Sequence, residues 1–381
     1  MQITSTIQLI SIITVFLSIF FSVFLLTIKT KNKAPNILLA FFLIIYAQDS
    51  GGAEFVSYYI YPNYPGLGML INETVFLNLP LLYLYLLSII YSDFKLRPKH
   101  LWHLAPYFIN ILIFMPRFYL GSFDEKWDFL NMGKSNVIEQ ELSYGLLHLQ
   151  TLVYFIACFY IINKYRKLLL ENFSNANMFN YRWLFQLVII LALGSLVASF
   201  KNIFMFFQIE TAYNFALVLV NVLSFLMICW IVMKALQSPE IFRGVNSKLQ
   251  LVKQLITKNK PISKFDLEQE LETESINNLN KFMQSEEPFL NPTLSISELA
   301  LQVGLPTKEL SVLINHNLNQ HFFDFINNYR VKKAMQILSN PEKSKLTILE
   351  ILYEVGFNSK STFNAAFKKY THLTPTQYRS N

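Results

Sequence analysis

The sequence is poor in charged residues. Only 15% of its 381 residues are Asp, Glu, Lys or Arg, while 53% are hydrophobic. A soluble domain normally has about a quarter of its residues charged. The deficit lies in the first two-thirds of the chain, where apolar runs of near membrane length follow one another. This pattern excludes a wholly soluble globular protein.

The sequence also lacks the residue patterns of metal sites and active sites. Cys158 and Cys229 are its two cysteines, and both lie inside apolar runs, so neither a disulfide framework nor a thiolate metal site is implied. His100 and His103 are one helical turn apart, but no acid or third histidine joins them at ligand spacing. No glycine-rich phosphate loop, nucleophile elbow or kinase signature is present. We therefore expect no metal, no cofactor and no enzymatic activity.

The apolar runs predict membrane-spanning helices. A helix of roughly 20 apolar residues crosses a ~30 Å hydrocarbon core, and seven segments approach that length. The first has neither a basic start nor an obvious cleavage site, so we interpret it as a span and not as a signal peptide. The predicted spans are Ile7–Ile28, Ile37–Tyr58, Ile71–Tyr91, Leu101–Tyr119, Leu146–Tyr165, Leu184–Phe204 and Tyr213–Met233.

Basic residues predict how these spans are oriented. Lys and Arg concentrate in alternate loops, and such loops face the cytoplasm. The N-terminus is then outside and the C-terminus is cytoplasmic, in a multi-pass protein. The basic loops hold Lys29, Lys31 and Lys33, then Lys95, Arg97 and Lys99, then Lys164, Arg166, Lys167 and Arg182.

Several polar residues interrupt the predicted spans. Ionisable groups in hydrocarbon are costly and often mark a cavity or pathway. One interpretation is a pocket open to the outside, with Lys201 paired to Asp49 or Glu73. The plainer one is that these groups lie at headgroup level and that Lys201 reaches the interface. The candidate pocket residues are Asp49, Glu54, Glu73, His148 and Lys201.

The C-terminal hundred residues differ in pattern, and their first part predicts a helix-turn-helix unit. Ser295 and Glu298 form a capping box that starts a short helix, and Gly304 ends it. Thr307 is the expected N-cap of the next helix. Its residues Leu310, Leu313 and Ile314 share an apolar face by the 3.6-residue period. The expected outward residues are Lys308, Ser311, Val312 and Asn315.

A second unit repeats this plan. Thr347 and Glu350 form another capping box, and Gly356 turns the chain into a helix over Ser359–Tyr370. Phe363, Ala366, Phe367 and Tyr370 form its inner face, and the outward residues are Lys360, Ser361, Asn364, Ala365 and Lys368. A short helix, a glycine turn and a second helix with a polar outer stripe is the geometry that places the second helix in a major groove.

The segment between the units is periodic and has no helix breaker. Phe322–Leu338 predicts one helix of roughly 25 Å at about 1.5 Å per residue. Such a strut could hold two recognition helices about one turn of DNA apart. From residue 289 onward there are ten basic and six acidic residues, a net charge of +4 that favours phosphate contact.

One tract runs from Thr347 through Gly356-Phe-Asn-Ser and Phe367-Lys-Lys to Thr374-Pro-Thr-Gln-Tyr-Arg379. This tract resembles the DNA-binding domain of AraC/XylS-type bacterial transcription regulators. The resemblance implies two base-reading helices, at Thr307–His316 and Ser359–Tyr370. It also implies a bacterial protein that binds promoter DNA, acts on RNA polymerase and pairs into a homodimer. With the predicted spans, this places the chain in a bacterial inner membrane. Val312 and Ala365 depart from the long polar readers of many relatives, and apolar side chains can contact thymine methyl groups instead.

The predicted fold class is all-α: a seven-helix transmembrane bundle followed by a soluble helical domain with two helix-turn-helix units. Residues 1–236 would form the membrane domain, 237–286 a cytoplasmic helical linker and 287–381 the DNA-binding domain. Within the linker we predict a basic amphipathic segment over Val245–Thr257 and an acidic helix from Asp266 to Met283. The linker is equally open to a spacer role and a coupling role.

The function predicted from these parts is a membrane-anchored, sequence-specific transcription regulator that responds to an external or membrane-dissolved signal ligand. The DNA-contacting residues would be Thr307, Lys308, Ser311, Asn315, Lys360, Ser361, Asn364 and Lys368, with Gly304 and Gly356 as structural turns. Two alternatives remain. One is a membrane receptor whose C-terminal helices dock a protein partner, and the other is a transporter-like domain with an attached regulator.

Overall fold

The computed structural model describes residues 2–30, 33–52, 55–91, 93–131, 138–175, 178–237 and 265–380. Every regular element in these ranges is a helix, and one isolated bridge joins Phe173 to Ser295. The chain divides into two compact units. The first unit is Met1–Asn163 with Phe179–Ser247, and we call it the membrane unit after the spans that the sequence predicts there. The second unit is Lys164–Met178 with Lys248–Asn381.

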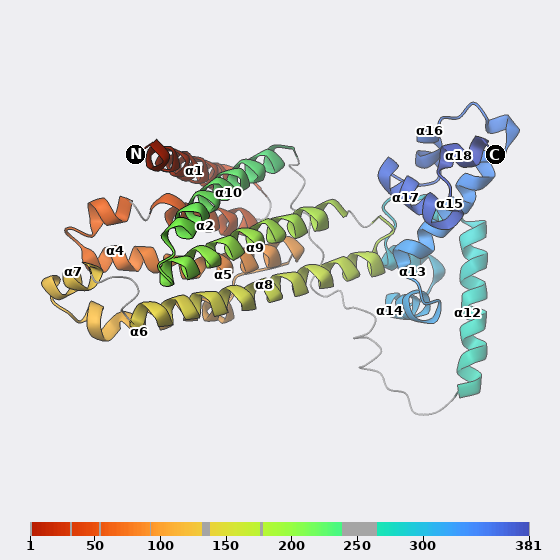
Figure 1. Cartoon of the computed structure of the whole chain (residues 1–381). Helices are drawn as coiled ribbons and strands as arrows, with labels where there is room; N and C mark the ends of the chain where they lie inside the picture. Colours follow the sequence, from red (N-terminus) through yellow and green to blue (C-terminus); the bar gives the residue numbers. More distant parts are fainter. Residues whose placement is uncertain are drawn as a thin grey trace. The chain divides into compact units, whose positions relative to one another are not determined.

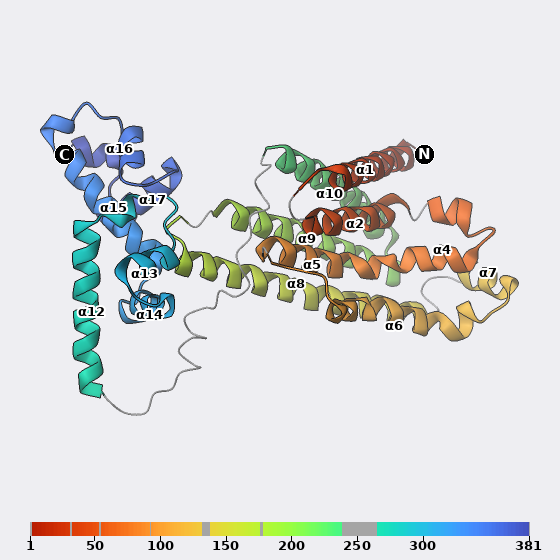
Figure 2. The same cartoon turned by 180° about the vertical axis from the view of Figure 1, so that it is seen from behind.

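The membrane unit is a bundle of mostly apolar helices. Helix α1 packs against α2 and α10, and α2 packs against α5, as Figures 1 and 2 show. The helices are α1 (Gln2–Thr27), α2 (Ala34–Ala47), α4 (Pro65–Asn72), α5 (Asn78–Ile90), α6 (Ala105–Phe114), α7 (Phe123–Asn131), α8 (Ile138–Asn172), α9 (Met178–Phe206) and α10 (Glu210–Gln237). From Lys164 onward, α8 belongs to the second unit.

Polar side chains of α1 face into this bundle. Ser11 Oγ donates to Asn221 Oδ1 of α10 at 2.7 Å, and Ser22 Oγ donates to the carbonyl of Ala40 in α2 at 3.1 Å. Ile12, Phe16 and Phe20, on the opposite face, are between 64% and 65% exposed. Polar groups inside and large apolar groups outside is the arrangement that suits a lipid surround.

The predicted number of spans was wrong. Among the described residues, five helices are long and apolar enough to cross a membrane by length and composition: Ile7–Thr27, Pro65–Ile90, Ile138–Asn172, Tyr181–Phe206 and Glu210–Ala235. A sixth is possible if Pro98–Tyr119 and Phe123–Asn131, which are bent by 111° at their junction, count as one broken span.

The predicted second span, Ile37–Tyr58, fails because of its polar and glycine residues. Helix α2 ends at Ala47 and widens into a π-helix, Gln48–Gly52, which contains Asp49. Gly51 lies against α1 so closely that a Cβ there would be 2.9 Å from Val15 Cγ2 and 3.2 Å from Ser11 Cβ. The α-helical part of this predicted span thus ends at Ala47, and the segment is not among the five candidate spans.

The second unit is organised around one long helix. Helix α15 (Phe322–Leu338) has the predicted bounds of the strut. Its first half joins a hydrophobic core with α12, α13 and α14, and its second half joins a separate core with α16 and α17. The other helices are α12 (Phe265–Ser285), α13 (Ile296–Val303), α14 (Thr307–Val312), α16 (Ile348–Glu354), α17 (Lys360–Thr371) and α18 (Pro375–Ser380).

Both predicted capping boxes are present. The backbone amides of Ser295 and Thr347 each donate to the carboxylate three residues on, at 2.7 Å in both cases. The predicted N-cap at Thr307 was wrong, because Pro306 takes that position and α14 begins at Thr307. Of the predicted linker segments, the acidic one lies within α12, and Val245–Thr257 lies outside the described residues.

Candidate functional site

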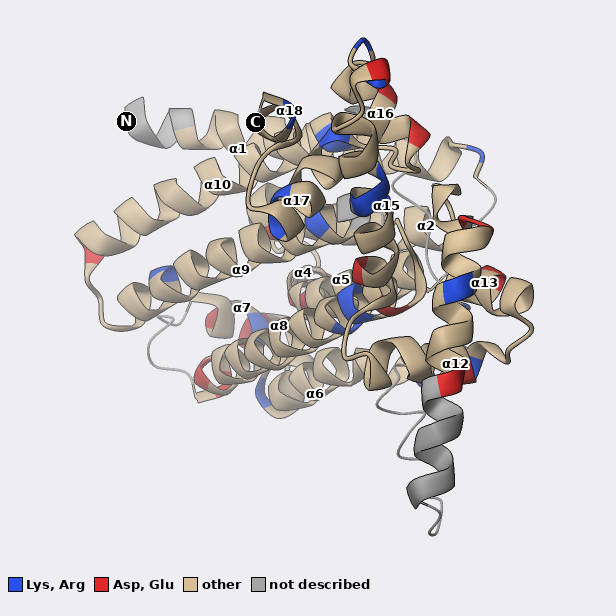
Figure 3. Cartoon of the chain, turned by 90° about the vertical axis from the view of Figure 1, so that its right-hand side faces the viewer, with Lys and Arg blue, Asp and Glu red and all other residues tan. Residues whose placement is uncertain are grey.

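The second recognition helix, α17, has the two faces that the sequence predicts. Phe363, Ala366 and Phe367 are buried in the domain core. Ser359 caps the helix by accepting a hydrogen bond from the Thr362 amide at 3.3 Å. Figure 3 shows basic residues on this helix in blue. Its outer stripe consists of Lys360, Ser361, Ala365 and Lys368, all exposed, and Asn364, which is half-buried.

The turn before α17 requires glycine. Gly356 has a φ of +88°, and a Cβ at this position would lie 2.7 Å from the carbonyl oxygens of both Phe289 and Leu290. Gly304, between α13 and α14, has a φ of +75°, but no heavy atom lies within 4 Å of a Cβ built there. Gly356 therefore permits both a left-handed turn and close backbone contact, whereas Gly304 permits the turn alone.

The first recognition helix presents fewer side chains than predicted. Thr307 and Lys308 are exposed on α14. Ser311, which was expected to point outward, is only 5% exposed. The inner face is nevertheless as predicted, because Leu310, Leu313 and Ile314 are buried.

Asn315 is occupied by hydrogen bonds within the second unit. Its Oδ1 accepts from the Phe322 amide at 3.0 Å and so caps α15. Its Nδ2 donates to the carbonyls of Ser311 at 3.1 Å and Glu171 at 3.3 Å. A base contact by Asn315 would have to replace these bonds.

Arg330 is a structural residue, although it is one of the ten basic residues from which the sequence analysis predicted phosphate contact. It is 1% exposed. Its Nε donates to the carbonyl of Phe289 and its Nη2 to that of Asn291, both at 2.7 Å, while Nη2 also reaches Ser174 Oγ at 3.2 Å. Burial lowers the pKa of Arg330 to about 10, so the guanidinium stays charged at neutral pH. Its guanidinium therefore holds the backbone of Phe289 and Asn291 and is not available at the surface for phosphate contact.

Three further basic residues pair with acids of the same unit. Lys333 lies 2.6 Å from Glu287, Lys343 lies 2.8 Å from Glu354, and Lys369 lies 2.6 Å from Asp324. These exposed or half-exposed pairs leave the net charge unchanged, but they engage three of the ten basic residues within the unit itself. The exposed lysines of the recognition helices, Lys308, Lys360 and Lys368, are the better candidates for phosphate contact.

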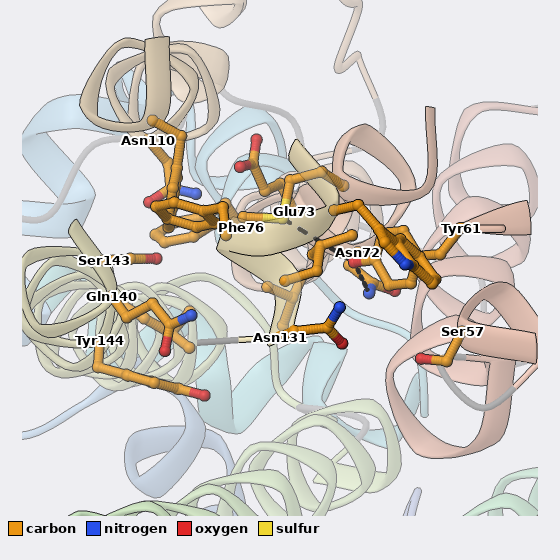
Figure 4. A pocket seen from close by; sticks show the side chains of 17 residues that line it. Ser57, Tyr61, Asn72, Glu73, Phe76, Asn110, Asn131, Gln140, Ser143 and Tyr144 are labelled. Atoms are coloured by element: carbon orange, nitrogen blue, oxygen red, sulfur yellow. Dashed lines mark hydrogen bonds between the residues drawn. The ribbon is translucent and has the colours of Figure 1, made fainter. Parts of the chain in front are cut away.

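The membrane unit holds a second candidate site, a cavity of about 440 Å³. It is lined by residues of η3 (Glu73–Leu77), α4, α6, α7 and α8, some of which Figure 4 labels. Of the predicted pocket residues, Glu73 lines this cavity, whereas Asp49, His148 and Lys201 are not among its described lining residues. Glu54 lies outside the described residues.

The other predicted pocket residues have their own contacts. Asp49 lies within Coulombic range of Lys201, and an ion pair between them stays a prediction. His148 Nδ1 lies 3.2 Å from Ser199 Oγ. Glu73 Oε2 instead accepts a hydrogen bond from Tyr119 OH at 3.1 Å. The sequence reasoning missed Asn110 and Gln140 in the cavity, although Asn110 stands out as an amide inside an apolar run.

Comparisons with known proteins concern the C-terminal part of the chain. Residues 299–381 match the model of a helix-turn-helix domain family. An uncharacterised HTH-type transcriptional regulator of Staphylococcus aureus (strain COL) is 36% identical over 88 residues, which are 23% of this chain and 11% of that protein. The Msm operon regulatory protein of Streptococcus mutans is 28% identical over 104 residues, which are 27% of this chain and 35% of that protein.

One solved structure also matches. It is the C-terminal domain of the two-component response regulator yesN from Fusobacterium nucleatum, with 31% identity and a TM-score of 0.24, covering 27% of this chain and 98% of that one. The chain thus spans only about a tenth of the staphylococcal relatives that it matches. Residues 299–381 thus form a helix-turn-helix domain, and the relatives are named as transcriptional or operon regulators, in line with the expectation that the chain is not an enzyme.

Replacing Gly356 with alanine should destabilise the second unit more than the same change at Gly304. Gly304→Ala should lower the free energy of unfolding by about 1 kcal/mol, the cost of a left-handed alanine. Gly356→Ala adds a backbone clash and should cost clearly more. Hydrogen exchange of the α15 amides in the full chain measures both. Equal effects would contradict the close approach to Phe289 and Leu290.

Arg330→Met should destabilise the same unit by about 3 kcal/mol, because it leaves buried carbonyl groups without a donor. Lys332→Met removes the same charge from an exposed position of the same helix and should change stability by less than about 0.5 kcal/mol. Urea-dependent exchange of the α15 amides compares the two variants. A tolerated Arg330→Met would show that the guanidinium does not hold the domain together.

Proposed function

We propose that this chain is a membrane-anchored, sequence-specific DNA-binding transcription regulator that responds to a signal ligand through its membrane unit. The single observation that carries the DNA-binding part is the outer stripe of α17, which displays lysines, a serine and an asparagine on a helix-turn-helix domain. The similarity to HTH-type transcriptional regulators supports it. The apolar helices support membrane anchoring.

In this proposal α17 enters a major groove and its residues divide the work. Lys360 and Lys368 neutralise phosphates, and Ser361 adds a hydrogen bond to the backbone or a base edge. Asn364 is suited to an adenine, because its amide can donate and accept at once. Exposed Ala365 offers a methyl group to a thymine.

The first unit would contact a neighbouring groove segment through α14. Thr307 and Lys308 are exposed for this purpose. Ser311 and Asn315 remain proposed contacts. Ser311 would have to become exposed, and Asn315 would have to break hydrogen bonds that it forms within the second unit. Helix α15, whose 17 residues correspond to roughly 25 Å, would set the distance between the two readers.

The proposal also covers the chain's surroundings. The second unit lies in the cytoplasm of a bacterial cell, where it reaches promoter DNA and RNA polymerase, and two chains pair on the DNA. The N-terminus lies outside. Basic residues near Lys29–Lys33 and Lys164–Lys167 support a cytoplasmic location for those segments.

Selection of bound duplexes from random fragments, with the full chain in detergent or nanodiscs, tests the DNA-binding part. We expect one preferred sequence, bound with an affinity that falls steeply as salt rises. A chain that retains no duplex at low ionic strength would leave the protein-docking alternative as the better explanation.

Base discrimination and phosphate contact can be separated by two substitutions on α17. Asn364→Ala should relax the preference at one base pair, losing about 1–3 kcal/mol of discrimination. Lys368→Ala, its control on the same helix, should weaken binding to all sequences and reduce the slope of the salt dependence by about 1. Repeating the selection with each variant provides the readout. An Asn364→Ala protein with unchanged preference would assign base reading elsewhere.

Labels at the two ends test the membrane arrangement. A reporter fused after the C-terminus should be active in the cytoplasm, and an impermeant reagent should modify a cysteine placed near the N-terminus from outside. Five spans place the ends on opposite sides, whereas six place them on the same side. Protection of the N-terminal cysteine would therefore support the broken sixth span and contradict the proposed orientation.

A further inference from the structure

The cavity of the membrane unit is lined by polar groups that form no hydrogen bond with the described part of the protein. Glu73 is 4% exposed and Asn110 is fully buried. Glu73 Oε1, both amide atoms of Asn110 and Oε1 of Gln140 have no hydrogen-bond partner within the described part of the chain. A buried polar group without a partner costs about 1–3 kcal/mol. Several of them around one cavity indicate a site that a polar ligand completes.

The charge of this site is uncompensated among its described lining residues. Glu73 is the charged member of that set, and no lysine, arginine or histidine belongs to it. Arg117 pairs with Glu139 at 3.2 Å. Tyr119 donates a hydrogen bond to one oxygen of the Glu73 carboxylate, and the other oxygen can accept from a further donor. A positively charged donor forms the strongest hydrogen bond with a carboxylate.

Aromatic rings make up much of the remaining wall. Tyr61, Phe76, Phe114, Trp127 and Tyr144 all line the cavity. The faces of such rings attract ammonium groups, and they also pack against the apolar body of a ligand. A volume of about 440 Å³ is within the usual range for sites that bind small organic molecules.

We infer that this cavity binds a small organic molecule carrying a protonated amine, which donates to Glu73 Oε1 while its other polar groups pair with Asn110 and Gln140. Figure 4 shows Glu73, Asn110 and Gln140 around the cavity together with Asn72 and Tyr144. The Asn72 amide is paired within the protein, because Nδ2 donates to Tyr61 OH at 2.6 Å and Oδ1 accepts from Gln48 at 3.0 Å.

This inference rests on the proposed sensing role and names the class of its ligand. On the proposed topology, Trp127 and Gln140 flank an external loop, so the ligand would enter from outside the cell. Binding to the cavity can be measured without DNA. The inference can therefore fail while DNA recognition stands, and DNA recognition can fail while the inference stands.

Thermal unfolding of the full chain in nanodiscs of neutral lipid tests the inference. The probes are benzylamine, 2-phenylethylamine and 3-phenylpropylamine, each paired with the alcohol of the same carbon skeleton. At least one amine should raise the melting temperature saturably, and its alcohol should do so only at about tenfold higher concentration or more. Amines that give no saturable shift, or alcohols that act equally well, would overturn the inference.

Two variants locate the effect. Glu73→Gln should weaken the stabilising amine at least about tenfold, while Glu210→Gln, which removes the same charge from an exposed position on α10, should leave it unchanged. Asn110→Leu keeps a similar volume and removes both unpartnered amide atoms. It should raise the melting temperature of the unliganded chain and weaken the amine.

If Glu73→Gln does not fold, Asn110→Leu decides the matter. A leucine variant that is more stable and binds the amine less well supports a ligand site. A leucine variant that is less stable, or that binds the amine as wild type does, assigns Asn110 a purely structural role and overturns the inference. Wild-type amine binding by Glu73→Gln would overturn it as well.

Discussion

The geometry of the second unit depends on α15 belonging to two hydrophobic cores at once. Phe322 and Ile326 pack with α13 and α14, and Val331 and Ile337 pack with α16 and α17. A rotation of either recognition helix would expose apolar surface on α15, which costs about 25 cal/mol per Å². Buried Arg330, between the two cores, ties the helix to the Phe289–Asn291 backbone. The distance between the two recognition helices is therefore set by how they pack against α15.

The same connection explains why one glycine matters more than the other. The carbonyl of Phe289 accepts from Arg330 and also lies where a side chain at position 356 would begin. The segment before α13 thus contacts both the strut and the turn into α17. Gly304 has no such neighbour. Local backbone conformation sets the first turn, whereas tertiary packing sets the second.

Much of the second unit could be predicted because its determinants are local. Capping boxes, glycine turns and the 3.6-residue period of Phe363 and Phe367 depend on nearby residues alone. Burial by partners distant in sequence could not be predicted, and Ser311 and Arg330 are the cases in which it reversed the expectation. In the membrane unit, hydropathy located the apolar segments. It did not reveal that Gly51 brings a π-helix against α1 or that α6 and α7 meet at a sharp bend.

Polar side chains in the membrane unit differ in whether another group of the protein forms a hydrogen bond with them. Ser11 with Asn221, and Tyr46 with Ser224, form hydrogen bonds of 2.7 Å and 2.8 Å inside the bundle. Helix packing thus satisfies some polar groups, although Ser18 Oγ and Asn36 Oδ1, which do not line the cavity, are also buried without a partner in the described part of the chain. Around the cavity, Asn110 keeps both amide atoms unpartnered although it is fully buried. An apolar residue there would serve packing better, which supports the proposed ligand site.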